Sequence, residues 1–308
     1  MFRKKGYDKI KYPFEFFQRG RQKLNRWQIS ELVEKALSED LPFEDLTSEL
    51  LIEDNLYGEA FFLAKEDLVV CGIPVVEEVF QKIDGTVELS FNVREGEEIS
   101  KGTKFGFAKG KVKSLLKGER VALNFLQHLS GIATAVRRMQ KKLSPYGITL
   151  LDTRKTLPGL KVLQKYAVRV GGGQNHRFSL SDGILIKDNH IKACGGMEKV
   201  LEKLNRTPHY ATVEIEVKSL KELSLVLESK ANISAVLLDN FSREDLTEAL
   251  EMIKRSGKRV LVEVSGGVKE ENLDRFLIQG IDYLSSGAIT HSVKAVDISF
   301  KVDKVWKV

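Results

Sequence analysis

The sequence is poor in cysteine and proline. Its 308 residues include six prolines and two cysteines, Cys71 and Cys194, which lie far apart and without the spacing of a metal-ligand motif. We therefore expect no zinc site and two ordinary buried or partly buried thiols in a reducing cytoplasm. No apolar run approaches the roughly 20 residues that a membrane span needs, and no secretory signal is visible. These absences predict a cytoplasmic protein without a membrane anchor.

The net charge of +6 is concentrated at one end of the chain. Residues 1–26 contain nine lysines and arginines against Asp8 and Glu15, a net charge of +7, which leaves −1 for residues 27–308. The same segment holds six aromatic residues, and this mixture suits nucleic acid or an anionic surface. We interpret it as a flexible or partner-docked extension without catalytic importance, and we do not expect nucleic acid to be the partner.

Residues 27–143 have the pattern of an α+β domain. Apolar residues from Ile29 to Leu37 recur at helical spacing, with Ser30 as a candidate N-cap and Pro42 as the end of the helix. Strands are expected over 57–64, 68–71, 87–93 and 103–108, and helices over 75–83 and 114–143. Nothing in this region resembles a nucleophile or a metal motif, so we expect a scaffold, rejoined by the C-terminal residues 291–308.

The long helix expected over 114–143 carries a second, polar stripe. It consists of Arg120, Asn124, Gln127 or His128, and Gly131. A polar stripe usually faces water, and a single histidine on such a helix is more often structural than catalytic. We therefore interpret the stripe as solvated.

Strands and helices alternate after Pro145. Strands are expected to begin near residues 148, 183, 212, 235, 260 and 282, with helical segments between them. This spacing is typical of right-handed βαβ units and a parallel sheet. A complete eight-stranded barrel takes about 250 residues. Because residues 144–290 are far fewer, we expect an incomplete parallel α/β barrel of about six to seven strands, as the second and catalytic domain.

The stretch Asp152–His190 concentrates cations at predicted strand ends. These are Arg154, Lys155, His176, Arg177 and Lys187. Guanidinium and ammonium groups gathered at one barrel mouth suit a multiply anionic substrate. The alternative is a solvated basic face, but the cations come from turns around one helix and not from the helix surface alone, so we favour a site.

Carboxylates are expected at the same mouth. The alternation in Thr212–Val217 puts Glu214 and Glu216 on the inward face of a strand, where they need a cation. Glu216 with Asp239 on the next strand would suit Mg²⁺ held partly by substrate phosphates. Ion pairs with Lys187 or Lys218 explain the same pattern equally well, so both remain open.

Small residues follow the last two predicted strands. The turns Ser265-Gly266-Gly267 and Ser286-Gly287-Ala288 let backbone N–H groups approach a phosphate. By contrast, Gly171-Gly172-Gly173 ends a helix and predicts a sharp turn. The mouth is therefore expected to hold a phosphate, a divalent cation and a second anion. No Ser-His-Asp, Cys-His or HExxH arrangement supports covalent hydrolysis.

Several motifs resemble the quinolinate phosphoribosyltransferase family, also called nicotinate-nucleotide pyrophosphorylase (carboxylating). They include Asp152-Thr-Arg-Lys-Thr-Leu-Pro-Gly-Leu, Lys165-Tyr-Ala-Val-Arg, Gly171-Gly-Gly-Gln-Asn-His-Arg, Leu185-Ile-Lys-Asp-Asn-His, Glu214-Ile-Glu-Val and Ser286-Gly-Ala-Ile-Thr-His-Ser. The resemblance runs from about Trp27 to Phe300 and excludes residues 1–26. Near Glu39–Thr47 the family commonly has glycines where Pro42 and Glu44 stand here, a difference in the scaffold.

The resemblance implies a reaction and a set of roles. Quinolinate and 5-phosphoribosyl-1-pyrophosphate would give nicotinate mononucleotide, CO₂ and pyrophosphate, in de novo NAD biosynthesis. Catalytic roles fall to Lys155, Lys187, Glu216 and Asp239. Lys155 and Lys187 would face the pyrophosphate, and Glu216 and Asp239 would hold Mg²⁺ and the ribose hydroxyls. Quinolinate would be bound by Arg120, Thr153, Arg154, Lys155, His176 and Arg177. The sugar pyrophosphate would be bound by Lys187, Glu216, Asp239, Ser265, Gly266, Gly267, Ser286, Gly287 and Ala288.

The resemblance also implies an assembly. Arg120 is expected to reach the quinolinate pocket from the neighbouring subunit of a homodimer with shared active sites, and a hexamer built from such dimers stays open. Two alternatives remain: a paralogous phosphoribosyltransferase that uses nicotinate or another acceptor, and a nucleic-acid-binding protein that acts through the basic extension.

Overall fold

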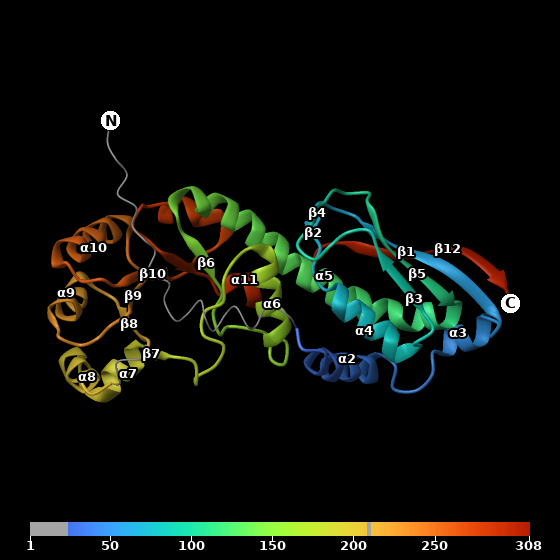
Figure 1. Ribbon diagram of the computed structural model, residues 1–308, viewed down its shortest axis with the longest axis horizontal. Coiled ribbons are helices and arrows are strands. Elements are labelled where there is room, and N and C mark those ends of the chain that lie inside the picture. Colours follow the sequence, from blue (N-terminus) through green and yellow to red (C-terminus); the bar gives the residue numbers. More distant parts are fainter. Residues whose placement is uncertain (1–23, 208–210) are drawn as a thin grey trace.

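The computed structural model describes residues 24–207 and 211–308 (Figure 1). Residues 1–23, which make up most of the expected basic extension, lie outside the described residues. Among those described, no helix is long and apolar enough to cross a membrane. An antiparallel sheet with helices forms one region and an α/β barrel the other, and the long helix α5 runs between them (Figure 1).

The first region is an α+β domain built around a four-stranded sheet. Its elements are α2 (Arg26–Asp40), α3 (Leu46–Leu51), β1 (Leu56–Ala64), β2 (Leu68–Val69), α4 (Ile73–Ile83), β3 (Glu88–Phe91), β4 (Glu98–Ile99), β5 (Lys104–Lys111) and α5 (Val112–Leu143). The sheet order is β12-β1-β5-β3, and β2 and β4 form a separate pair. The strand β12 (Ile298–Lys307) returns from the C-terminus and pairs antiparallel with β1.

Aromatic side chains tie this returning strand to the sheet. The ring of Phe62 on β1 is fully buried, and its centroid lies 4.8 Å from that of Phe300 on β12. Phe80 on α4 also packs on Phe300, at 6.0 Å between ring centroids. Because inward residues of a strand alternate with outward ones, these rings form the contact between the sheet and the helices that cover it.

The second region is an incomplete barrel. Its elements are β6 (Thr149–Leu151), α6 (Lys161–Gly171), β7 (Ile184–Ile186), α7 (Asp188–Cys194), α8 (Met197–Leu204), β8 (Val213–Val217), α9 (Leu220–Glu228), β9 (Ala235–Asp239), α10 (Arg243–Ser256), β10 (Leu261–Ser265), β11 (Tyr283–Ser285) and α11 (Ala288–His291), with 3₁₀ turns at Ser144–Tyr146 and Glu270–Phe276. The strand order is β6-β11-β10-β9-β8-β7, and the pairings between neighbouring strands are parallel.

A single bridge adds a seventh position to this barrel. Gln174 pairs in parallel with Leu151 on the free edge of β6, so the segment after α6 takes the place of a strand there. The described residues show no pairing between that segment and β7, and the barrel is open at this point. The predicted fold class, an incomplete parallel α/β barrel of six to seven strands with an N-terminal α+β domain, is confirmed.

Two local predictions were wrong. The helix α2 begins at Arg26 with Asn25 as its N-cap, so Ser30 lies inside the helix and caps nothing. The polar stripe of α5 does not face water throughout. Gln127 donates from Nε2 to the carbonyl oxygen of Ile298 at 2.9 Å, and a Cβ on Gly131 would lie 2.4 Å from the Lys294 carbonyl oxygen. The returning C-terminal chain covers this part of the helix, which local periodicity could not show.

Candidate active site

The carboxyl ends of the barrel strands bring the predicted site residues to one mouth. Lys187 follows β7, Asp239 and Ser265 are the last residues of β9 and β10, and Ser286 follows β11. Since the pairings are parallel, all these ends face the same way, and side chains from different strands can meet around one ligand.

A buried hydrogen-bond network holds the two cationic loops together. Asp152 follows β6 and is fully buried, and one of its carboxylate oxygens forms an ion pair with Lys165 of α6 and accepts the backbone N–H of His176 at 2.9 Å. Its other oxygen accepts from Nδ2 of Asn175. Burial raises the pKa of Asp152 and lowers that of Lys165, and their mutual attraction opposes both shifts. The network fixes the loop of Arg154 against the segment that carries Arg177.

Arg154 and Arg177 lie near enough for their positive charges to interact. Arg177 is buried, and burial together with the positive charge of Arg154 lowers the pKa of its guanidinium. Arg154 is exposed at the mouth. Like charges held side by side in this way repel each other unless an anion lies between them, so this pair is suited to binding a carboxylate.

Lys187 and Glu216 form an ion pair at the mouth. Nζ of Lys187 lies 3.0 Å from Oε2 of Glu216, whose side chain is 6 % exposed, whereas the lysine side chain is 47 % exposed. Asp239 ends the neighbouring strand and accepts a hydrogen bond from Nδ2 of Asn240 at 2.8 Å. Lys218 pairs with Asp188 instead, at 2.6 Å. Oxygen ligands on adjacent strand ends therefore lie beside a lysine that a substrate anion could reach.

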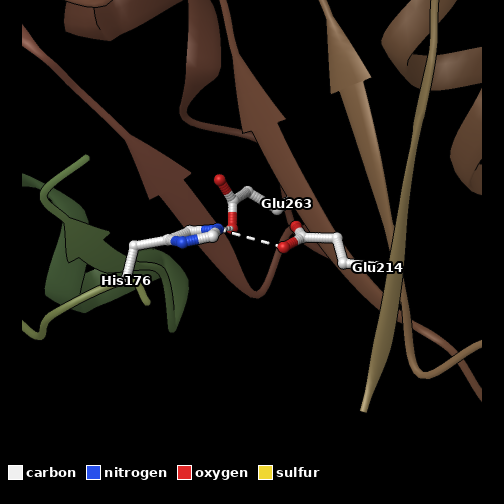
Figure 2. Close-up of side chains that lie close together, drawn as sticks. All are labelled: His176, Glu214 and Glu263. Carbon is white, nitrogen blue, oxygen red and sulfur yellow. Dashed lines mark hydrogen bonds and ion pairs between the residues drawn. The ribbon is translucent and has the colours of Figure 1, made fainter. Parts of the chain in front are cut away.

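Glu214 has a different partner from the one expected. Figure 2 shows the ring of His176 pointing at Glu214 and Glu263, inward-facing carboxylates of β8 and β10. Nε2 of His176 lies 3.0 Å from Oε2 of Glu214 and 3.5 Å from Oε2 of Glu263. The expectation that a lysine or a metal neutralises Glu214 was incomplete, because its hydrogen-bond partner is a histidine from across the barrel.

The three ligand atoms of this cluster lie within 4.8 Å of one another, a separation that a metal ion could span. However, Nδ1 of His176 accepts the backbone N–H of Arg177 at 2.7 Å. The ring proton therefore resides on Nε2, which has no lone pair to offer a metal. The geometry assigns the ring a different task, since it holds the backbone of Arg177 on one side and Glu214 on the other.

Glu263 is kept protonated at neutral pH. Burial, and next the negative charge of Glu214, raise its pKa to about 8. The unpaired Oε1 atoms of Glu214 and Glu263 and the unpaired Nε of Arg177 are buried, and these residues line a cavity that also reaches Tyr283. The cluster thus carries one negative charge fewer than its two carboxylates suggest.

Both glycine turns are shaped by close contacts. Gly266 has φ +111°, and a Cβ there would lie 2.3 Å from Oδ1 and 2.8 Å from the backbone nitrogen of Asn240. A Cβ on Gly287 would lie 2.9 Å from Cδ of Lys155. The first turn therefore requires glycine, and the second lets the Lys155 side chain lie against the turn after β11.

Arg120 is not brought to this mouth within one chain. It is exposed on α5, eight residues before His128, which contacts the barrel through Gln164 at 2.9 Å. At 1.5 Å per residue, Arg120 lies about 12 Å further along the helix, within the N-terminal domain. The other predicted residues surround one mouth, and Arg120 stands apart from them.

Some residues that shape the site were not among the candidates. They are Lys165, Asn175 and Glu263, together with Gln164. The sequence signal for Glu263 was present, since it is a carboxylate inside an otherwise apolar strand, Leu261–Ser265, like Glu214 before it. Because a buried carboxylate needs a polar partner, Glu263 could have been predicted to lie beside the same partner as Glu214.

Fold and site together define a class: an α/β-barrel protein of incomplete closure whose strand ends carry cations and carboxylates suited to a multiply anionic ligand. Comparison with known families identifies one family within this class. Residues 45–130 match the quinolinate phosphoribosyl transferase N-terminal domain and residues 132–301 match its C-terminal domain. The chain belongs to the quinolinate phosphoribosyltransferase family.

Individual relatives agree. "Quinolinate phosphoribosyltransferase [decarboxylating] 1b" of Nicotiana tabacum is 40% identical over 295 residues, covering 90% of this chain and 83% of the relative. "Probable nicotinate-nucleotide pyrophosphorylase [carboxylating]" of Methanocaldococcus jannaschii is 40% identical over 277 residues, covering 88% and 96%. The solved nicotinate-nucleotide pyrophosphorylase from Francisella tularensis superposes with a TM-score of 0.85 at 37% identity, covering 92% of this chain and 99% of that one.

The fold extends further than the family. Human nicotinic acid phosphoribosyltransferase superposes with a TM-score of 0.57 at 13% identity, over 92% of this chain and 74% of that one. At that identity the likeness shows the fold alone, so it gives no support to nicotinate as the acceptor of this chain.

Proposed function

We propose that the chain transfers the phosphoribosyl group of 5-phosphoribosyl-1-pyrophosphate to quinolinate, giving nicotinate mononucleotide, CO₂ and pyrophosphate. The observation that carries this proposal is the density of cations at one mouth. The charges of Arg154 and Arg177 interact there, and Lys155 and Lys187 follow β6 and β7, the two edge strands on either side of the opening in the barrel. A substrate with one carboxylate would not require so many cations, whereas a dicarboxylate and a pyrophosphate do.

Arg154 and Arg177 bind the two carboxylates of quinolinate in this proposal, with Lys155 and Thr153 beside them. Oγ1 of Thr153 accepts the backbone N–H of Lys155 at 3.0 Å, which supports a defined shape for this loop. His176 acts indirectly in this proposal, because both of its ring nitrogens are hydrogen-bonded within the protein, to Arg177 and to Glu214. Its part in quinolinate binding is to hold Arg177 in place.

Glu216 and Asp239 lie beneath the ribose in this proposal. As C1 of the ribose loses pyrophosphate it gains positive charge, which nearby carboxylates stabilise. The donor set fits Mg²⁺, because both groups offer oxygen at adjacent strand ends and leave positions for substrate phosphates. The ion would neutralise charge on the leaving pyrophosphate. Lys187, paired with Glu216, and Lys155 face the same leaving group in this proposal.

The turns Ser265–Gly267 and Ser286–Ala288 bind the 5′-phosphate in this proposal. The close approach of Asn240 to Gly266 and of Lys155 to Gly287 supports a defined shape for both turns. Oγ of Ser286 donates to the carbonyl oxygen of Val268 at 2.7 Å, which links the two turns.

The bond changes balance as follows. The ring nitrogen of quinolinate forms a bond to C1 of the ribose while the bond from C1 to the pyrophosphate oxygen breaks. The bond between ring carbon 2 and its carboxylate then breaks, the electron pair stays on that carbon beside the cationic nitrogen, and a proton replaces CO₂. Because the carboxylate must leave, Arg177 cannot bind it so tightly that its charge is never released.

We also propose a homodimer in which Arg120 completes the site of the partner. The helix α3 lies beside Arg120, since Nζ of Lys117 on α5 pairs with Glu49 of α3 at 2.9 Å. Large apolar side chains are exposed there, with Leu46 at 80 % and Leu50 at 82 %. Apolar side chains beside an arginine that cannot reach its own mouth support a partner surface. A hexamer built from such dimers is compatible with this surface.

We place the reaction in the cytoplasm. Both cysteines are free, and Cys71 is buried, as in proteins that fold under reducing conditions. Some plant relatives carry the words mitochondrial or chloroplastic in their names. Fractionation of the source cells followed by immunodetection tests this placement, and enrichment in an organelle would contradict it.

The substrate is tested by incubating the protein with 5-phosphoribosyl-1-pyrophosphate and either quinolinate or nicotinate, and measuring pyrophosphate release. Release with quinolinate and not with nicotinate is expected. Release with nicotinate alone would contradict the proposal and favour the paralogous activity.

A further inference from the structure

A second group of buried hydrogen bonds lies next to Lys155, formed by side chains that the roles above do not use. Gln164 on α6 is fully buried. Its Oε1 accepts the backbone N–H of Leu157 at 2.9 Å, and its Nε2 donates to the carbonyl oxygen of Thr290 at 2.9 Å. One side chain therefore joins the loop after β6 to the helix α11.

Thr290 makes the link to Lys155 itself. It is fully buried on α11, and its Oγ1 donates to the carbonyl oxygen of Lys155 at 2.7 Å. The Lys155 side chain lies against Gly287, as the contact of its Cδ with a Cβ built there shows. Backbone and side chain of Lys155 are thus both held to the turn Ser286–Ala288 and the helix that follows it.

His128 brings the N-terminal domain into the same group. Its Nε2 lies 2.9 Å from Nε2 of Gln164. The orientation of the Gln164 amide is fixed, because Leu157 offers a donor and Thr290 an acceptor. Nε2 of His128 must therefore accept, and the ring proton resides on Nδ1. Burial lowers the pKa of His128, which favours this neutral form.

We propose that Gln164 and Thr290 are positioning residues for the transfer reaction, which hold Lys155 at a fixed separation from the phosphate-binding turn Ser286–Ala288. The inference rests on the proposed function. A sugar bearing a pyrophosphate at one end and a phosphate at the other presents two anionic groups at a set distance. A rigid link between the groups that bind them orients C1 of the ribose, and a displacement of about 1 Å costs on the order of 100-fold in rate.

The test compares Thr290→Val with Thr290→Ser in the full chain. Valine keeps the shape and removes the hydroxyl, whereas serine keeps the hydroxyl. We expect Thr290→Val to lower kcat/KM for 5-phosphoribosyl-1-pyrophosphate by on the order of 10- to 100-fold. We expect Thr290→Ser to keep kcat/KM within about threefold of the wild-type value. Thr247→Val is the matched control, since Oγ1 of Thr247 donates to the Arg243 carbonyl oxygen at 3.0 Å on an outer helix.

Gln164→Leu is paired in the same way with Gln140→Leu. Gln140 also joins a backbone N–H to a carbonyl, accepting from Leu150 at 2.8 Å and donating to Ile148 at 3.0 Å, away from the mouth. Both variants lose the same kind of bonds, so both should lower the melting temperature. Only Gln164→Leu should lower kcat/KM for the sugar pyrophosphate.

Wild-type kinetics for Thr290→Val, or equal kinetic losses in the two glutamine variants, would overturn the inference. If Gln164→Leu does not fold, the two threonine variants decide alone. Failure of the proposed function is distinguishable, because the wild type itself would then release no pyrophosphate. In that case the affinities of the wild type and of Thr290→Val for inorganic pyrophosphate, measured by calorimetry, decide the inference, and equal affinities overturn it.

Discussion

At the scale of single residues, the site depends on buried polar side chains that hold other site residues in place. His176 shows this most clearly, because the family resemblance implies that it contacts quinolinate, whereas its ring nitrogens are both engaged inside the protein. The cation next to it is Arg177, whose backbone N–H the histidine ring accepts.

Glu263 should make the stability of the fold depend on pH. Its pKa of about 8 in the folded state exceeds the value of about 4.3 expected in the unfolded chain. Between these two values the unfolded state binds fewer protons, so the free energy of unfolding falls as pH rises. Glu263→Gln removes this dependence. We expect the stability of the variant relative to the wild type to increase from pH 5 to pH 8, measured by urea unfolding, and an unchanged difference would contradict the raised pKa.

The two glycines after β10 should respond differently to alanine. A Cβ on Gly266 collides with Asn240, whereas one on Gly267, with φ +59°, meets nothing within 4 Å. We expect Gly267→Ala to cost about 1 kcal/mol for its left-handed backbone, and Gly266→Ala to cost more and to raise KM for the sugar pyrophosphate at least tenfold. Thermal unfolding and steady-state kinetics of both variants check this, and equal effects would contradict the role given to the Gly266 turn.

At the scale of elements, short strands present the chemistry and the helices hold it in place. The strands β6, β7 and β11 have three residues each, too few to fix loop positions by ladder hydrogen bonds alone. The loop after β6 is held instead from α6, through Lys165 and Gln164. The helix therefore determines the geometry of the loop that precedes it.

Lys165→Met should show how much the stability of the loop after β6 depends on the ion pair between Lys165 and Asp152. It leaves the buried carboxylate of Asp152 without its cation, and breaking such a pair costs about 3–5 kcal/mol. Lys141→Met is the control, because Lys141 pairs with Glu98 at 2.7 Å on the surface and should cost less than about 1 kcal/mol. Denaturant unfolding of both variants measures the difference, and similar losses would contradict the account of the Asp152 network.

Strand positions could be predicted from the sequence because each strand is a short apolar run followed by a polar or glycine residue. The partners of inward-facing side chains could not. His176, Glu214 and Glu263 come from three separate segments, and their meeting depends on how far the barrel curls before it opens. The stripe on α5 was misread for a similar reason, since the chain that covers it returns more than 150 residues later.

At the scale of the whole molecule, the proposed role of Arg120 in the quinolinate pocket requires a second copy of the chain. We predict that Arg120→Ala and Lys155→Ala are each inactive, and that mixing them restores activity, because a mixed dimer has one site with neither change. With free exchange of subunits, about one quarter of all sites should be intact. Pyrophosphate release before and after mixing is the measurement, and no recovery after confirmed exchange would contradict the shared site.

The central claim is that this mouth binds a dicarboxylate and removes one carboxylate during phosphoribosyl transfer. The most direct measurement uses quinolinate labelled in the carboxylate at ring carbon 2. We predict one labelled CO₂ for each nicotinate mononucleotide formed, and none without the sugar pyrophosphate. Release of labelled CO₂ without the sugar pyrophosphate, or a mononucleotide that keeps the label, would contradict the account.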